Sequence, residues 1–143
     1  MGAFSTFSVS GSGLTADRLW MSVIAENLAN SQTTVTPQGG PYRRQEVVFA
    51  AGETPGTGFS ASLSRAMGVR VAAIVPDPSP LPQVYDPSSP QANPQGYVTM
   101  PNVNPVKEMT DLVVASQSYN ANVSALSTEE STDQAAFKIL QGV

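Results

Sequence analysis

The chain has 143 residues, of which 41% are hydrophobic and 13% charged, with a net charge of −4 and no cysteine or histidine. This length predicts one domain with a modest core, and the charged fraction is about half of the ~25% usual in globular proteins. Disulfides, thiolate catalysis, zinc fingers and histidine acid–base chemistry are excluded. The acidic balance without a basic run argues against binding to nucleic acid or anionic membranes.

The sparse charge indicates that copies or partners cover much of the surface. The N-terminus lacks a charged stretch followed by a long apolar run, so we do not expect a cleaved secretory signal. No apolar run approaches the ~18–20 residues that a membrane-spanning helix needs.

Residues 3–30 predict an amphipathic helix. Its apolar seam repeats every seven residues, at Phe7, Leu14, Met21 and Leu28. A seam this regular predicts a second helix packed against it. Gly11 and Gly13 weaken the start of the helix by about 1 kcal/mol each relative to alanine.

The centre of the chain predicts a small β structure. Residues 31–41 form a turn-rich exit, and 42–50 and 69–75 each have the composition of a strand. The glycine-rich residues 52–58 form a loop between these strands, and 59–66 favour neither helix nor strand. Two strands across such a loop predict a hairpin.

A proline-rich segment follows this hairpin. Residues 76–94 hold seven of the twelve prolines, which excludes a helix or a central strand and predicts an extended, irregular path. Residues 96–100 can pair briefly as a strand.

The last element is predicted to be a helix from Asn104 to about Leu140, with Asn104 as N-cap and Pro105 at the first helical position. Heptads counted from Met109 give an apolar seam, which Glu130 and Asp133 interrupt. The heptad positions a are Met109, Ser116, Val123, Glu130 and Phe137, and the positions d are Leu112, Tyr119, Leu126, Asp133 and Leu140.

The chain is therefore expected to be mainly α. Its N- and C-terminal helices would pair as a coiled coil, with a small β-containing, proline-rich central segment between them. The domain organisation follows as an N-terminal helix in 1–36, a central segment in 37–103 and a C-terminal helix in 104–143, the two helices forming one inner coiled-coil domain.

Three motifs invite a chemical interpretation. Gly11–Ala16 (GSGLTA) matches a dinucleotide-binding fingerprint, but no buried strand precedes it and no acidic residue follows about 20 positions later, so small residues for close helix contact are the better interpretation. Residues 52–58 lack the lysine of a phosphate-binding loop. Arg43 and Arg44 can bind an anion, but an ion pair within or between subunits is favoured.

Other candidate sites are weaker. Asp77 and Asp86 have no spacing that brings them together as an acid–base pair, and Trp20 and Tyr119 lie on apolar helix faces, where packing is commoner than stacking on bases. We therefore expect no enzyme activity, no cofactor, no metal and no small-molecule substrate. Two alternatives stay open, namely a compact helical-bundle interaction module and an enzyme with an unrecognised site.

The chain resembles the rod/hook family of bacterial flagellar axial proteins. The segment 10–34 (SGSGLTADRLWMSVIAENLANSQTT) is similar to the family signature, and the segments 39–49 and 84–123 are similar to its proximal-rod subunits. The signature positions matched here are Leu14, Thr15, Ala16, Arg18, Val23, Ile24, Asn27, Leu28, Ala29, Asn30 and Thr33. The final segment, 126–143, is more acidic than this family pattern.

This resemblance implies a structural subunit of the flagellar proximal rod in the periplasm, exported by the flagellar type III apparatus without a cleaved signal. The implied partners are copies of itself, other flagellar rod proteins, the membrane-embedded basal ring and the export gate region. Its terminal helices would form a tubular drive shaft that transmits torque and encloses the export channel. The expected assembly interface comprises Phe7, Leu14, Met21, Ile24, Leu28, Met109, Leu112, Tyr119, Val123, Leu126, Phe137 and Leu140.

Overall fold

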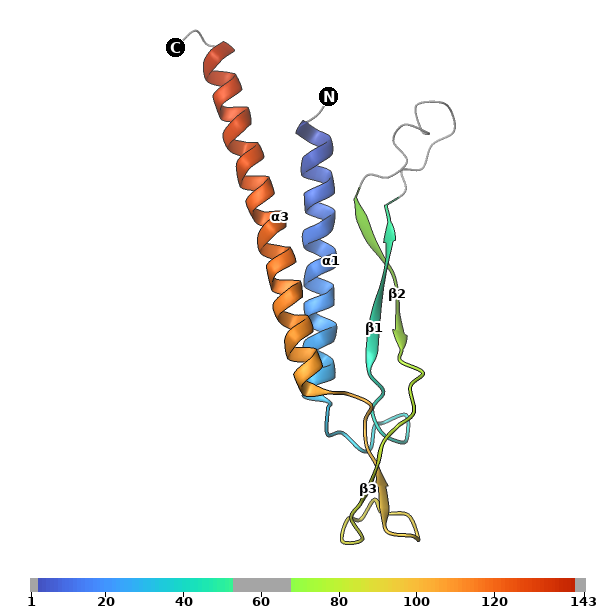
Figure 1. The fold of residues 1–143 in the computed structure, drawn as a ribbon. Coiled ribbons are helices and arrows are strands. Elements are labelled where there is room, and N and C mark those ends of the chain that lie inside the picture. The colour runs from blue at the N-terminus through green and yellow to red at the C-terminus, as the bar shows by residue number, and fades with distance from the viewer. Residues whose placement is uncertain (1–2, 53–67, 141–143) are drawn as a thin grey trace, which may run out of the picture.

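The structure, a computed structural model, describes residues 3–52 and 68–140. Two long helices lie side by side, and a two-stranded β ribbon runs along the first of them (Figure 1). A second, smaller ribbon lies beyond the end of the helices that is opposite both chain termini. In chain order, the elements are α1 Ala3–Ala29, β1 Gln45–Ala51, β2 Val69–Pro76, β3 Gln83–Tyr85, β4 Tyr97–Thr99 and α3 Pro105–Leu140.

Both predicted helices are present, and their packing against each other is confirmed. α1 continues through Gly11 and Gly13 without interruption. α3 begins as expected, because the Asn104 Oδ1 accepts hydrogen bonds from the backbone N–H groups of Val106 and Lys107 at 3.0 and 3.3 Å. This side-chain cap satisfies donors that have no partner within the helix.

The predicted hairpin is also confirmed. β1 and β2 are antiparallel, with Gln45 opposite Pro76 and Ala51 opposite Val69, and the register shifts between Val48 and Phe49. The strands cover nearly the residues expected from composition, because β-branched and aromatic side chains suit a pleated, half-buried surface.

The β1–β2 ribbon contacts α1 at two places, one at the start of β2 and one near the middle of α1. At the start of β2, the Ser12 Oγ accepts a hydrogen bond from the Val69 N–H at 3.0 Å. Gly68 comes this close because it has no side chain: its φ is +96°, and a Cβ there would lie 2.3 Å from the Ser12 Oγ. At the middle, Trp20 packs edge-on against Phe49 with ring centroids 5.7 Å apart.

The proline-rich segment contains one strand that its composition did not predict. β3 pairs with β4 in an antiparallel ribbon of three residues each, and Tyr85 packs against Tyr97 with centroids 5.2 Å apart. β3 lies between Pro82 and Pro87, and neither strand contains a proline. Every residue of the ladder therefore has a backbone N–H. The brief strand expected within 96–100 is β4.

The heptads predicted that positions a and d of α3 both face α1. The structure agrees for position d and differs for position a. Leu112, Tyr119 and Leu126, at the predicted d positions, are half-buried, whereas Met109 and Val123, at a positions, are exposed. The residues one position earlier lie in the contact instead, and they are small or polar: Glu108, Ala115 and Asn122. The heptad prediction considered only hydrophobicity, and it therefore assigned the contact to the larger side chains of Met109 and Val123.

Few apolar side chains are buried within the described part of the chain. The buried ones are Ala16, Val23, Ile24, Val98 and Ala115. None of the described helices has a stretch apolar and long enough to cross a membrane. The segment 59–66 and almost all of the expected 52–58 loop lie outside the described residues.

The two glycines of α1 provide a matched test of the close helix contact. A Cβ on Gly13 would lie 2.8 Å from the Asn122 Nδ2 of α3, whereas a Cβ on Gly11 would meet nothing within 4 Å. We expect Gly11→Ala to raise the free energy of unfolding by about 0.5–1 kcal/mol through helix propensity. Gly13→Ala should lower it, because Asn122 must move. Chemical denaturation followed by circular dichroism measures both, and equal stabilisation by the two variants would contradict the close contact.

Candidate assembly interface

The base of the helix pair, where α1 ends and α3 begins, is held by a buried polar side chain. Asn27 is 1% exposed and makes four hydrogen bonds. Its Nδ2 donates to the Gln45 carbonyl at 2.9 Å and to the Glu108 Oε2 at 3.0 Å. Its Oδ1 accepts from the Gln45 N–H at 2.8 Å and from the Tyr42 hydroxyl at 3.0 Å. Asn27 thus joins α1, β1 and α3 with its full hydrogen-bonding capacity.

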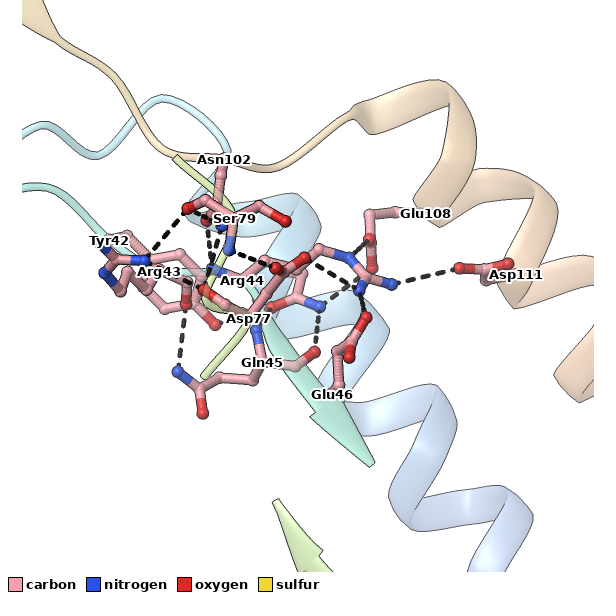
Figure 2. A network of polar contacts seen from close by, with 11 residues as sticks. Tyr42, Arg43, Arg44, Gln45, Glu46, Asp77, Ser79, Asn102, Glu108 and Asp111 are labelled. Carbon is pink, nitrogen blue, oxygen red and sulfur yellow. Dashed lines mark hydrogen bonds and ion pairs between the residues drawn. The ribbon is translucent and has the colours of Figure 1, made fainter. Parts of the chain in front are cut away.

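Arg44 binds the same Glu108 carboxylate as this asparagine. Figure 2 shows that carboxylates surround its guanidinium. Its Nε donates to the Glu108 Oε1 at 2.5 Å, and its Nη2 lies 3.4 Å from the Asp111 Oδ2. Its Nη1 donates to Glu46 and lies 3.7 Å from the Asp77 Oδ2. One guanidinium therefore links four acidic side chains from β1, α3 and the residues after β2.

The ion pair between Arg44 and Glu108 is buried, so the stability of the fold depends on it. Arg44 is 8% exposed and Glu108 is fully buried. Burial by itself lowers the pKa of Arg44, but the hydrogen bonds and charges of Glu108 and Glu46 outweigh it and raise that pKa above its usual value. Removing Arg44 would leave the buried Glu108 carboxylate without a compensating charge, which is strongly destabilising.

The same junction holds the chain that leads away from β2. The Arg43 Nη1 donates to the carbonyls of Asp77 and Ser79 at 3.0 and 3.2 Å, and the Asn102 Oδ1 accepts from the Arg44 N–H at 2.9 Å. Hydrogen bonds from Ser79 lower the pKa of Asp77, which keeps this carboxylate charged. The expected structural ion pair at Arg43 and Arg44 is thus found at Arg44, within one chain, while Arg43 binds backbone carbonyls.

Tyr42 completes the junction. Its burial, together with the negative charges of Glu26 and Glu108, raises its pKa from 10.0 to about 12. The neutral phenol is therefore the form that the fold stabilises, and it donates to Asn27.

Higher along the helix pair, a second buried polar residue joins the two helices. Asp17 is 7% exposed, and its Oδ2 accepts hydrogen bonds from Ser118 at 3.2 Å and from the Asn122 Nδ2 at 2.9 Å. It lies at a cleft of about 440 Å³ between the two helices and the ribbon. The apolar wall of this cleft includes Trp20 and Phe49.

The structure places the expected interface residues at three levels of exposure. Ile24 is buried within the chain, and the side chain of Leu140 lies outside the described residues. Half-buried are Leu14, Met21, Leu28, Leu112, Tyr119 and Leu126. Exposed are Phe7, Met109, Val123 and Phe137.

The residues that hold the helices together were not predicted as a site. Asn27 was recognised as a signature position near the end of its helix, and neither Glu108 nor Asp17 was expected to join the two helices. Their signal in the sequence is a polar residue at helical spacing on an apolar face, since Asn27 follows Ile24 by three positions. That spacing does not reveal which partner satisfies the polar group.

Two of the candidates that invited a chemical interpretation have structural roles in the described part of the chain. Gly11–Ala16 lies inside α1, so it forms no loop around a phosphate, and Gly13 permits close helix contact as expected. Trp20 packs on Phe49. Among the described residues, no cluster of carboxylates has the arrangement needed to hold a metal ion.

Replacing Asn27 tests the junction. We expect Asn27→Ala to lower the free energy of unfolding by about 2–4 kcal/mol, because the buried Glu108 and the backbone of Gln45 lose their partners. Asn30→Ala is the matched control: Asn30 bonds within its own helix end, to Glu26 and Thr33, and its loss should change stability by less than about 1 kcal/mol. Equal effects in urea denaturation would contradict a special role for Asn27.

The raised pKa of Tyr42 predicts a loss of stability in alkali. A group whose pKa is raised on folding contributes fully below its unfolded value, and this contribution falls as the pH rises. The wild-type chain should therefore lose stability between pH 10 and about 12 more steeply than Tyr42→Phe. Denaturation at a series of pH values, with tyrosinate absorbance recorded in parallel, measures both. Identical slopes would show that Tyr42 ionises as a solvent-exposed phenol.

Comparison with known proteins adds independent evidence. Residues 95–139 match the family described as flagellar basal body rod FlgEFG protein C-terminal, a stretch that includes β4 and nearly all of α3. Flagellar basal-body rod protein FlgC of Borreliella burgdorferi is 43% identical, over 99% of this chain and 100% of the relative.

Two further relatives carry the same name. The FlgC protein of Bacillus subtilis is 42% identical over 97% of this chain and 99% of the relative, and that of Yersinia enterocolitica is 40% identical over 92% of each. These matches include both helices and the central segment. With identity this high over nearly the whole length, the chain belongs to the FlgC family of flagellar basal-body rod proteins.

Proposed function

We propose that this chain is a structural subunit of the proximal rod of the flagellar basal body. Its helices pack against those of neighbouring subunits to form a tubular drive shaft, which transmits torque and encloses the export channel. Residues 1–36 and 104–143 form the inner, coiled-coil domain of this tube, and residues 37–103 form the outer part. Family membership supports the general role, and the distribution of apolar side chains supports the mode of assembly.

The observation that carries the proposal is the placement of polar and apolar residues on the helix pair. The contact within the chain is made by small and polar residues such as Gly13, Asp17 and Asn122. Many of the large apolar side chains on the two helices face outward instead. Those exposed on the two helices are Phe7, Val9, Leu19, Val106, Met109, Val113, Val114, Val123, Phe137 and Ile139.

Ten exposed apolar side chains on two helices favour a partner that covers at least part of them. Soluble monomers rarely expose large contiguous apolar patches, and such patches mark interaction sites. Burying one large apolar side chain contributes about 1.5–3 kcal/mol, so a few of these residues stabilise an interface substantially. Only 13% of the residues are charged, so few charged groups must lose water when subunits assemble. The free-energy cost of desolvation at the interface is therefore low. A compact helical-bundle module would instead bury its apolar residues within one chain.

The expected interface residues fit this arrangement in two ways. Ile24 stabilises the helix pair from inside, and Leu112, Tyr119 and Leu126 lie at the edge of the same contact. The exposed members of the set are available to neighbouring subunits. These subunits are copies of the chain and other flagellar rod proteins, with the membrane-embedded basal ring and the export gate region at the base of the rod.

The junction at Arg44 and Asn27 serves the mechanical role. A shaft transmits torque only if its inner helices and outer ribbons move together. Hydrogen bonds and ion pairs at one buried point fix the angle between α1, α3 and β1. The chain reaches this place by type III export, without a cleaved signal, and acts in the periplasmic part of the basal body.

Val123→Glu tests the assembly. Val123 is 42% exposed, so the substitution should change the free energy of unfolding of the isolated chain by no more than about 0.5 kcal/mol. Rod assembly should fail, because the interface would bury a carboxylate without a partner. Swimming motility and electron microscopy of isolated basal bodies measure assembly.

Gln83→Glu is the control, since it adds the same charge on the exposed β3 and should leave motility unchanged. Normal rods in cells that carry only Val123→Glu would refute a role for this face of α3 in assembly.

A further inference from the structure

The cleft beside Asp17 is wide enough to hold a small molecule. Its volume of about 440 Å³ lies within the range of about 300–1,000 Å³ that is usual for ligand sites. Residues from α1, α3, β1 and the start of β2 line it. Two of the lining residues are the glycines Gly13 and Gly68, and because neither has a side chain, the cleft stays open at both places.

Asp17 brings a carboxylate to this cleft without a positive charge beside it. The residue is 7% exposed, and its Oδ2 accepts hydrogen bonds from Ser118 and Asn122. Among the described residues, none donates a hydrogen bond to its Oδ1, and no lysine or arginine forms an ion pair with it. Buried carboxylates are normally paired with a cation. Asp17 therefore has an oxygen free to accept from a positively charged group that enters the cleft.

The cleft also has an aromatic wall. Trp20 follows Asp17 by three positions in α1, so both side chains lie on the same face of the helix. Phe49 packs against Trp20 at an interplanar angle of 82° and is 39% exposed. In such an edge-to-face pair, each ring keeps at least one face free of the other ring. The faces of aromatic rings are negative, and they attract cations that lie within about 6 Å.

We propose that this cleft binds a small organic cation in which an ammonium group is joined to a flat apolar ring. The ammonium group donates a hydrogen bond to the Asp17 Oδ1, and the ring packs against Trp20 and Phe49. Charge complementarity selects this chemistry, because the described residues that line the cleft include one carboxylate and no lysine or arginine. A neutral ligand would not compensate the carboxylate, and an anion would be repelled. This binding site is separate from the structural role in the rod and needs no neighbouring subunit.

The chain has a single tryptophan, so its fluorescence reports directly on this site. Phenethylammonium should change the fluorescence of Trp20 in the purified full chain with a saturable dependence on concentration. Phenethyl alcohol has nearly the same shape without the charge, and it should bind at least about tenfold more weakly, because it makes no charge-assisted hydrogen bond to Asp17. Equal affinities for the two probes, or no saturable change with phenethylammonium, would refute the site.

Asp17→Asn removes the charge and keeps the shape of the side chain. It should lower the affinity for phenethylammonium by at least about tenfold and leave the affinity for phenethyl alcohol unchanged. Glu130→Gln is the matched control, since it removes the same charge from an exposed position of α3, and it should alter neither affinity. Undiminished binding of phenethylammonium by Asp17→Asn would overturn the assignment. The comparison of the two probes uses the unsubstituted chain, so it decides the question even where Asp17→Asn is less stable.

Phe49→Leu tests the aromatic wall. The substitution keeps an apolar side chain and removes the ring, so it should weaken the binding of phenethylammonium by about three- to fivefold. The affinity is measured by the same Trp20 titration. Unchanged affinity would refute the contact between the ligand and this wall.

An arginine side chain from a partner protein is another cation that fits a carboxylate beside an aromatic ring. N-acetylarginine amide stands for this occupant, and it should bind at least about tenfold more weakly than phenethylammonium, because it has no aromatic ring to pack against Trp20 and Phe49. Tighter binding of the arginine probe would overturn the assignment to a small aromatic amine. Failure of the proposed function would look different: the chain would be missing from isolated basal bodies, whatever the two probes do.

Discussion

The structure depends on the buried ion pair between Arg44 and Glu108, with Asn27 bonded to the same carboxylate. Arg44 directly precedes β1, Glu108 lies in α3 and Asn27 lies in α1. A fully buried carboxylate is tolerated because the guanidinium and the amide satisfy both of its oxygens. Few apolar side chains are buried among the described residues, so this polar junction, together with the Ser12–Val69 and Trp20–Phe49 contacts, holds the ribbon against the helices.

Small and polar residues also form the contact between the two helices farther from this junction. Because Gly13, Asp17 and Asn122 close the contact within the chain, apolar side chains on the outer faces stay available. Specific polar pairing sets the register inside the subunit. In the proposed assembly, non-directional apolar burial would add stability between subunits when neighbours cover these faces.

Much of this architecture was predictable from local patterns. The two helices, the β1–β2 hairpin and the Asn104 cap were confirmed, because each depends on residues close in sequence. The short strand β3 was missed because three residues between prolines carry no period. Leu112 and Tyr119 border the contact as the heptads predicted, whereas Met109 is exposed, since a hydrophobic pattern cannot show that Glu108 is the residue turned inward.

The sequence by itself determined the elements of this protein, its resemblance to flagellar axial proteins and the excess of apolar residues on its helices. Local propensity and periodicity are sufficient for those conclusions. Only the tertiary structure decided which face of each helix lies inside, how far α3 extends beyond α1 and which acids surround Arg44. These features depend on contacts between residues as far apart as Asn27 and Glu108, and no local pattern records the partner of a buried polar group.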